Sequence, residues 1–119
     1  MSSYRLCVQI VTHNSAKTID ACLTALADQC FEDYCVLVID NASEDATRER
    51  LIAHGVPFIA NNQNRGYAAA HNQALMLSDT PFVMTLNPDI ALCPHFLQEM
   101  MQTLEVNPGL GSAAGRLLR

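Results

Sequence analysis

The feature that most constrains this chain is its alternation of short, β-branched apolar runs with segments of helical periodicity. The apolar runs cover residues 6–12, 34–40, 56–60 and 82–86, and the helical patterns cover residues 16–29, 44–54, 67–77 and 94–105. Strands that alternate with helices in this way build a parallel sheet covered by helices. With 119 residues, 50% of them hydrophobic, the chain has the size and the core material of one domain. We therefore predict an α/β three-layer sandwich with a mostly parallel sheet, as one domain over residues 1–119.

Local signals mark where several of these elements begin and end. Asn14 or Ser15 can cap the first helix and Ser43 the second, because their side-chain oxygens accept hydrogen bonds from free backbone N–H groups. Gly55 fits the left-handed position after the second helix. The run that ends at Asp40 is almost entirely apolar, as expected for a central strand buried on both faces. Residues 109–119 can begin one more strand.

Charge and hydropathy exclude several classes of protein. The formal net charge is −5 and Lys and Arg form no cluster, so we do not expect a nucleic acid partner, because binding a phosphate backbone requires concentrated positive charge. No apolar run reaches the roughly 20 residues of a membrane-spanning helix. The apolar segment near the N-terminus is too short for a signal peptide. We expect a cytoplasmic protein, whose full-length form can lie at the inner face of the membrane.

Neither the cysteines nor the histidines have the spacing of a metal site. The five cysteines are odd in number and form no C-x-x-C pair, so we expect them to behave as small buried hydrophobes. The four histidines, at positions 13, 54, 71 and 95, lack H-x-x-x-H spacing. We expect them in surface, loop or packing positions.

Polar residues follow every predicted strand. They are Thr12, His13 and Asn14 after the first, Asp40, Asn41 and Ser43 after the second, residues 61–66 after the third, and Asn87 and Asp89 after the fourth. One such residue alone is more often a turn former or a helix cap. Because ligands bind at the carboxyl ends of parallel strands, four polar strand ends together indicate a binding site at one edge of the sheet. Such a site offers acceptors for hydroxyl and N–H groups and a carboxylate for a cation.

Four segments resemble, in order, the diagnostic blocks of family 2 glycosyltransferases. They are V-T-H-N-S at 11–15, V-I-D-N-A-S-E-D at 38–45, N-R-G-Y-A-A-A-H-N at 64–72 and L-N-P-D at 86–89. The nearest subgroup is the bacterial rhamnosyltransferase-like one. The resemblance implies a GT-A (Rossmann-like) fold and transfer of a sugar from a UDP- or dTDP-sugar, with dTDP-rhamnose among the candidates. The implied acceptor is a saccharide or a lipid-linked molecule, in the synthesis of cell-surface polysaccharide.

The resemblance also implies roles for the residues that follow the first two strands. Thr12 and Asn14 would lie beside the nucleotide of the donor. Asp40 would accept a hydrogen bond from the pyrimidine ring or the ribose, and Asn41 and Ser43 would shape the same loop. For Ser43 the role of helix cap is equally open.

The loop after the third strand is implied to approach the nucleotide closely. Asn64 and Gly66 would bring backbone to the ligand, since glycine permits unusual φ values and has no Cβ. Arg65 would contact phosphate, or be an ordinary exposed loop residue. Asn72 would belong to the same loop network.

The segment from Asn87 to Asp89 stands at the position of the family's D-x-D motif. This implies that Asp89 binds a divalent cation, Mg²⁺ or Mn²⁺, against the donor diphosphate, with Asn87 beside the nucleotide-sugar. Hard cations of this kind bind through one or two carboxylates and substrate phosphates. Asn87 stands where the D-x-D motif has its first aspartate, and this replacement in principle lowers the affinity for a metal ion. The alternative is a simple N-P-D turn at the end of an edge strand.

No catalytic base is expected within the chain. Inverting members of the family take the acceptor proton with an acid well downstream of the D-x-D position. Beyond Asp89 the only acids are Glu99 and Glu105, both in a predicted helix. We therefore expect the base beyond Arg119, and we expect the chain to be a truncated donor-binding part that is inactive alone.

Two other classes of function are alternatives to a glycosyltransferase. A non-catalytic module that binds a nucleotide or a sugar stays open. A dinucleotide-binding Rossmann enzyme is disfavoured, because T-H-N-S-A-K follows the first strand in place of the phosphate-binding G-x-G-x-x-G. An uncovered edge of a truncated sheet would also allow association into a homo-oligomer.

Overall fold

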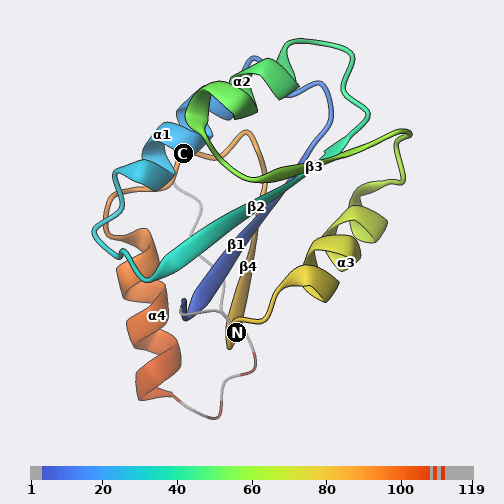
Figure 1. The fold of residues 1–119 in the computed structure, drawn as a ribbon. Coiled ribbons are helices and arrows are strands. Elements are labelled where there is room, and N and C mark those ends of the chain that lie inside the picture. Colours follow the sequence, from blue (N-terminus) through green and yellow to red (C-terminus); the bar gives the residue numbers. More distant parts are fainter. Residues whose placement is uncertain (1–3, 108, 110, 112–119) are drawn as a thin grey trace.

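The computed structural model describes residues 4–107, 109 and 111, and it contains four strands that alternate with four helices. In chain order these are β1 (Leu6–Thr12), α1 (Ile19–Ala27), β2 (Tyr34–Asn41), α2 (Thr47–His54), β3 (Phe58–Asn61), α3 (Tyr67–Leu77), β4 (Phe82–Leu86) and α4 (Phe96–Val106). The strands form one parallel sheet in the order β3-β2-β1-β4 (Figure 1). The predicted alternating α/β architecture with a parallel sheet is therefore confirmed.

The two faces of the sheet are covered unequally. One face packs against α1, α2 and α4 in a large core that includes Val8, Ile10 and Val38 from the strands. Of the helices that the structure describes, only α3 packs against the other face, where Ala70 and Ala74 contact Val11 and Ile39. The small alanine side chains let α3 approach the sheet closely, and the molecule has three layers (Figure 1).

Burial along each strand follows its position in the sheet. All seven residues of β1 are buried, because β1 pairs with β2 on one side and β4 on the other. In β2 the last four residues are buried and the first four are only half-buried. The reason is that β3 pairs with β2 from Val38 onward, so the first half of β2 has a neighbour on one side only. The prediction that β2 is buried along its whole length is thus wrong for that half.

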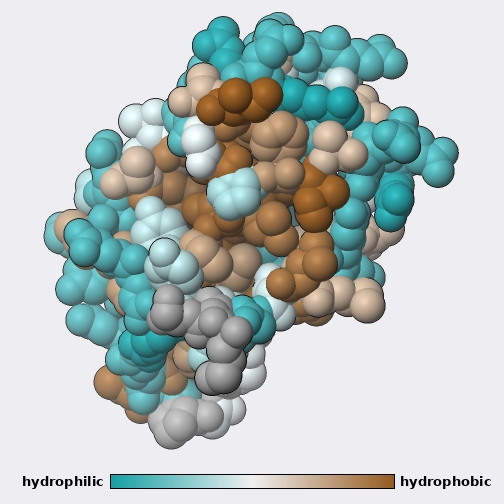
Figure 2. Space-filling model, viewed as in Figure 1, coloured by the Kyte–Doolittle hydropathy of each residue, from teal (hydrophilic) through white to brown (hydrophobic). Residues whose placement is uncertain are grey.

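An apolar surface remains exposed beside the sheet. Figure 2 shows apolar side chains gathered in the middle of the molecule, between α2 and α3. Large apolar side chains are exposed on both flanking helices. They are Ile52 on α2 and Tyr67, Leu75, Met76 and Leu77 on α3. A surface of this kind is a candidate for contact with another protein surface.

The predicted helix caps after β1 and β2 are wrong. Helix α1 begins at Ile19 after a turn closed on the carbonyl oxygen of Ser15, and α2 begins at Thr47. Neither helix has a side-chain cap. The side chains of Asn14 and Ser43 instead make contacts between the two loops, which removes them from capping. Gly55 does occupy the left-handed position after α2, with φ of 70°, as predicted.

The other element boundaries differ less from the sequence-based prediction. Helix α3 and strand β4 have the predicted bounds, whereas β3 and α4 each begin two residues later than predicted. The strand expected within residues 109–119 falls mostly outside the described residues. Among those described, no helix has the length and apolar character needed to cross a membrane.

The cysteines are all free thiols. Cys7 and Cys22 are buried, as expected for small hydrophobes, but Cys30 and Cys93 are exposed. The expectation of burial therefore holds for only part of the set.

Candidate functional site

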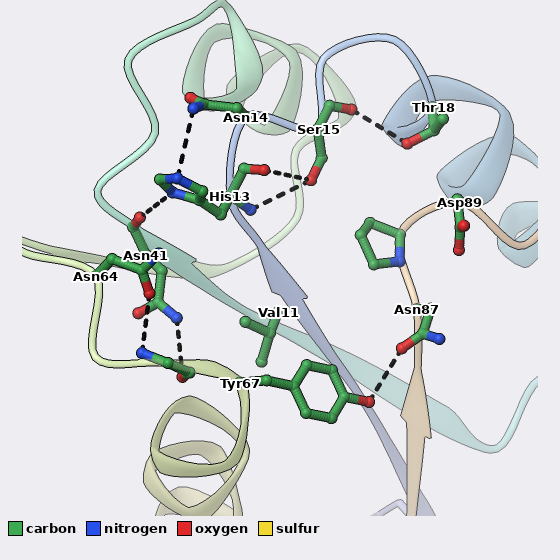
Figure 3. A pocket seen from close by; sticks show the side chains of 12 residues that line it. Val11, His13, Asn14, Ser15, Thr18, Asn41, Asn64, Tyr67, Asn87 and Asp89 are labelled. Carbon is green, nitrogen blue, oxygen red and sulfur yellow. Dashed lines mark hydrogen bonds between the residues drawn. The ribbon is translucent and has the colours of Figure 1, made fainter.

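Residues that follow all four strands line one open pocket of ≈ 730 Å³ at the carboxyl edge of the sheet (Figure 3). The lining residues are Val11, His13, Asn14, Ser15, Thr18, Asn41, Asn64, Gly66, Tyr67, Asn87, Pro88 and Asp89. Six predicted site residues are among them: Asn14, Asn41, Asn64, Gly66, Asn87 and Asp89. The parallel topology brings these residues together because every strand ends at the same edge.

Asp40 has no exposed surface and is not among the residues that line the pocket. Its Oδ1 accepts hydrogen bonds from Thr12 Oγ1 (2.7 Å) and Ser43 Oγ (2.6 Å). Its Oδ2 accepts hydrogen bonds from the Ser43 amide (3.1 Å) and from Arg48 Nε (2.8 Å). Thr12, Asp40 and Ser43 therefore form one hydrogen-bonded network, and none of the three is among the lining residues.

The hydrogen bonds to Asp40 keep its carboxylate ionised. Burial alone would raise the pKa of Asp40, but the hydrogen bonds from Arg48, Ser43 and Thr12 outweigh burial, and the pKa lies below its usual value. Arg48 also donates to the carbonyl oxygen of Asn61 (3.2 Å), so one guanidinium joins the ends of β2 and β3. Sequence reasoning missed Arg48, because a single arginine in the first turn of a helix carries no signal of a buried partner.

A second set of contacts locks the β1–α1 loop to the β2–α2 loop. The backbone N–H of Asn14 donates to Ser43 Oγ (2.9 Å), and the side-chain oxygen Oδ1 of Asn14 accepts from the backbone N–H of Glu44 (2.8 Å). The Ser15 amide donates to Thr47 Oγ1 (2.8 Å). Asn14 and Ala42 both have left-handed backbone, with φ of 51° and 54°. Non-glycine residues adopt such φ values only where the surrounding contacts over-determine them, so this side of the pocket is rigidly built.

The loop after β3 is held by Asn41. Its Nδ2 donates to the carbonyl oxygen of Gly66 (3.1 Å), and its Oδ1 accepts from Asn61 Nδ2 (3.0 Å) and from the Arg65 amide (3.4 Å). The Gly66 amide donates to Asn64 Oδ1 (2.9 Å). Gly66 has φ of 87°, a conformation that other residues avoid. Its backbone lines the pocket without a side chain in the way.

Besides Thr12, Asp40 and Ser43, two more predicted site residues, Arg65 and Asn72, are not among the residues that line the pocket. The Arg65 guanidinium is exposed and makes no hydrogen bond or ion pair to a described residue, although its backbone belongs to the lining loop. Asn72 is exposed on α3, one turn beyond the loop, and the structure does not bring it to the pocket.

Two aromatic residues of the lining were not predicted as site residues. The ring of His13 donates from Nδ1 to the carbonyl oxygen of Asn41 (2.6 Å). The Tyr67 hydroxyl donates to Asn87 Oδ1 (3.0 Å) across the pocket from α3 to the end of β4. The one signal for Tyr67 was its place directly after Gly66, at the start of a helix that points its N-terminus at the site.

Asp89 is the only carboxylate among the lining residues. No hydrogen bond or ion pair joins its carboxylate to another described residue. Burial, and then the negative charge of Asp89, raise the pKa of the nearby Cys22 thiol to about 11. Among the described residues, no group of three or more His, Cys, Asp or Glu side chains is arranged to hold a metal ion. A divalent cation therefore fits here only if it takes most of its ligands from a bound substrate and water.

Comparison with known proteins gives the same picture of the fold. The family model described as Glycosyl transferase family 2 matches residues 7–117. A curated relative, the teichoic acid poly(glycerol phosphate) polymerase of Staphylococcus epidermidis, is 23% identical over 112 residues, which are 89% of this chain and 16% of the relative. The chain spans between 16% and 36% of the length of the curated relatives it matches.

Several solved structures are similar over most of the chain. S. aureus TarS 1-349 in complex with UDP-GlcNAc has a TM-score of 0.82 and 21% identity, covering 94% of this chain and 37% of that one. Glucosyl-3-phosphoglycerate synthase from Mycobacterium tuberculosis, in complex with Mn²⁺, UDP and glucosyl-3-phosphoglycerate, has a TM-score of 0.73 and 21% identity, covering 86% of this chain and 40% of that one.

Proposed function

Because this chain belongs to glycosyl transferase family 2, we propose that its pocket binds the nucleotide-diphosphate-sugar donor of a glycosyl transfer reaction together with a divalent cation. The observation that carries the proposal is the convergence of four strand ends on one pocket, whose single carboxylate has no hydrogen-bond or ion-pair partner in the described part of the chain. The neutral hydrogen-bonding groups of the lining suit a base and a ribose. The carboxylate suits a cation, Mg²⁺ or Mn²⁺, bound between Asp89 and the diphosphate.

The charges at the pocket support the cation. A diphosphate placed beside Asp89 would be repelled by the carboxylate, and Asp89 is the only lining residue of fixed charge. A divalent cation between the two groups turns that repulsion into attraction. We propose that the exposed Arg65 guanidinium, next to Gly66 in the loop after β3, adds a positive charge near the phosphates. The relative crystallised with Mn²⁺ and UDP supports the same pairing of ligands.

Each part of the chain has a distinct task in this proposal. The network around Asp40 holds the β1 and β2 loops in place, so that Asn14 and Asn41 meet the nucleotide without a costly rearrangement. Gly66 lets the backbone approach the ligand. The cation supplies electrostatic stabilisation of the charge that develops on the leaving diphosphate.

The motif resemblance and the relatives narrow the range of candidate donors and acceptors. We propose a UDP- or dTDP-sugar, with dTDP-rhamnose retained from the subgroup that the motifs resemble, and a saccharide or lipid-linked acceptor in cell-surface polymer synthesis. The relative named for teichoic acid polymerisation supports that setting.

The residue that removes the acceptor proton is proposed to lie outside this chain. Glu99 and Glu105 are on α4 and do not line the pocket, and Glu105 forms an ion pair with Arg5. We therefore propose an inverting transferase in which these 119 residues bind donor and metal but do not transfer sugar alone. Incubation of the chain with Mn²⁺, nucleotide-sugars and acceptors, followed by mass spectrometry, tests this directly.

The binding proposal is tested by thermal unfolding with UDP, dTDP and GDP, each with and without Mn²⁺. A ligand that binds only the folded chain raises its melting temperature, and at a free ligand concentration about 100 times Kd the stabilisation is about 2.7 kcal/mol. We expect UDP or dTDP with Mn²⁺ to give the largest shift, and Asp28→Asn, outside the pocket, to leave that shift unchanged. No shift with any nucleotide at millimolar concentration would refute the proposal.

A further inference from the structure

We propose that Tyr67 is a positioning residue that turns the side-chain carbonyl of Asn87 away from the cation, so that Asp89 is the only side chain of this pocket that binds it. This inference rests on the proposed function and deepens it. It concerns the first position of the N-P-D segment, where Asn87 has an oxygen that could also ligate a hard cation.

The contact that carries the inference is the hydrogen bond from the Tyr67 hydroxyl to Asn87 Oδ1, at 3.0 Å. Figure 3 shows the Tyr67 ring reaching from the start of α3 to the end of β4, with the carbonyl oxygen of Asn87 turned toward the tyrosine. The Asp89 carboxylate lies beyond Pro88, on the other side of Asn87 in the same view. The side-chain oxygen of Asn87 therefore has a partner on α3, whereas the Asp89 carboxylate has none among the described residues.

The orientation of Tyr67 is supported from within α3 by His71. The two residues are four positions apart, which places them on the same face of the helix. Their rings meet edge to face, with centroids 4.4 Å apart and an interplanar angle of 71°. Both ring nitrogens of His71 are buried without a hydrogen-bond partner among the described residues, so the imidazole acts here as an aromatic packing surface. Since Tyr67 is otherwise 56% exposed, this contact and the hydrogen bond to Asn87 define its position.

The consequence is a cation site with one protein carboxylate. The remaining ligands must come from the donor diphosphate and from water, so the cation and the nucleotide are expected to bind in a mutually dependent way. By linkage, Mn²⁺ must raise the affinity for UDP by the same factor as UDP raises the affinity for Mn²⁺. Were Asn87 Oδ1 free, it would add a protein ligand and loosen this dependence.

The experiment is a double-mutant cycle on Tyr67 and Asn87, read as Mn²⁺ affinity in the presence of UDP by electron paramagnetic resonance. In the original chain we expect Asn87→Ala to weaken Mn²⁺ binding by less than about twofold and Asp89→Ala to weaken it by more than about tenfold. In a Tyr67→Phe background the carbonyl is released, and Asn87→Ala should then weaken Mn²⁺ binding measurably. A tenfold loss on Asn87→Ala alone would overturn the inference.

A second readout separates this inference from the proposed function. In the ligand-free protein, Tyr67→Phe should shift the side-chain amide signals of Asn87 in a ¹H–¹⁵N spectrum, because the partner of Oδ1 is lost. His71→Phe, which keeps an aromatic ring under Tyr67, should leave those signals in place, whereas His71→Ala should move them. Amide signals that do not respond to Tyr67→Phe would overturn the positioning role even if UDP and Mn²⁺ bind. If the amide signals respond but Mn²⁺ and UDP do not bind the original chain, the cation assignment falls together with the proposed function.

Discussion

The two sides of the pocket differ in how completely their polar groups are satisfied. On the side formed by β1 and β2, the buried carboxylate of Asp40 accepts four hydrogen bonds, and the loops are joined by backbone-to-side-chain contacts. On the side formed by α3 and β4, Asp89 has no partner among the described residues, and Tyr67 is mostly exposed. Two aspartates that look alike in sequence thus stand in opposite situations. A carboxylate satisfied by the protein stabilises the fold, whereas an unsatisfied one in a pocket is available to a ligand.

The largest expected effect comes from Asp40→Ala. The variant leaves Arg48, Thr12 and Ser43 without their shared acceptor, so we expect the free energy of unfolding to fall by about 3–5 kcal/mol. Urea denaturation measures the change, with the exposed Asp28→Ala as the control. A decrease in the free energy of unfolding of less than about 1 kcal/mol, the size of one ordinary hydrogen bond, would contradict the difference that we describe between the two sides of the pocket.

Asp89→Ala should have little effect on stability and a large effect on ligand binding. Because its carboxylate makes no hydrogen bond or ion pair to a described residue, we expect the stability to change by less than about 0.5 kcal/mol. Calorimetry should instead show that the Mn²⁺-dependent part of UDP binding is lost. Asp40→Ala, where it remains folded, should weaken UDP binding with or without Mn²⁺, because it disturbs the loops that carry Asn14 and Asn41. Identical behaviour of the two variants would contradict the separate roles assigned to them.

A smaller effect is expected from pH through His71. Burial lowers the pKa of His71 below its usual value near 6.5, so the unfolded chain binds a proton there more readily than the folded chain. The free energy of unfolding should therefore fall as the pH decreases from 6.5 toward the lower pKa of the folded state. His71→Phe should flatten this part of the profile, measured by thermal unfolding from pH 7 to pH 5. A profile that the substitution leaves unchanged would show that His71 is not the group responsible.

The smallest expected effect concerns association between copies of the chain. The exposed apolar side chains of α3, with Met76 at 88% exposure, favour weak self-association at high concentration. Met76→Lys should lower the apparent mass in light scattering without changing the melting temperature, since the side chain makes no core contact. The matched control is Gln102→Lys on α4. A monomeric original chain across the whole concentration range would rule this association out.

The pattern of strands and helices was readable from the sequence because periodicity reports burial directly. The apolar runs of β1 and β4 and the alanine-rich pattern of α3 have the predicted bounds, and the parallel order of elements placed all strand ends at one edge. The positions of Asn14, Asn41, Asn87 and Asp89 around one pocket follow from that topology alone. The roles that we propose for them at a nucleotide-sugar stay predictions.

What the sequence by itself determined is therefore the alternating architecture, the family and the edge at which polar residues meet. Only the tertiary structure decided which of those polar residues have their hydrogen-bonding groups satisfied by other parts of the protein. Ser43 and Asn14 look like helix caps in sequence, but a hydrogen bond between them joins two loops. Arg48, at the start of the next helix, donates to the buried Asp40, and Tyr67 reaches across to Asn87. The physical reason is that periodicity encodes which face of an element is apolar, whereas hydrogen-bond partners between loops are set by the packing of elements far apart in the chain.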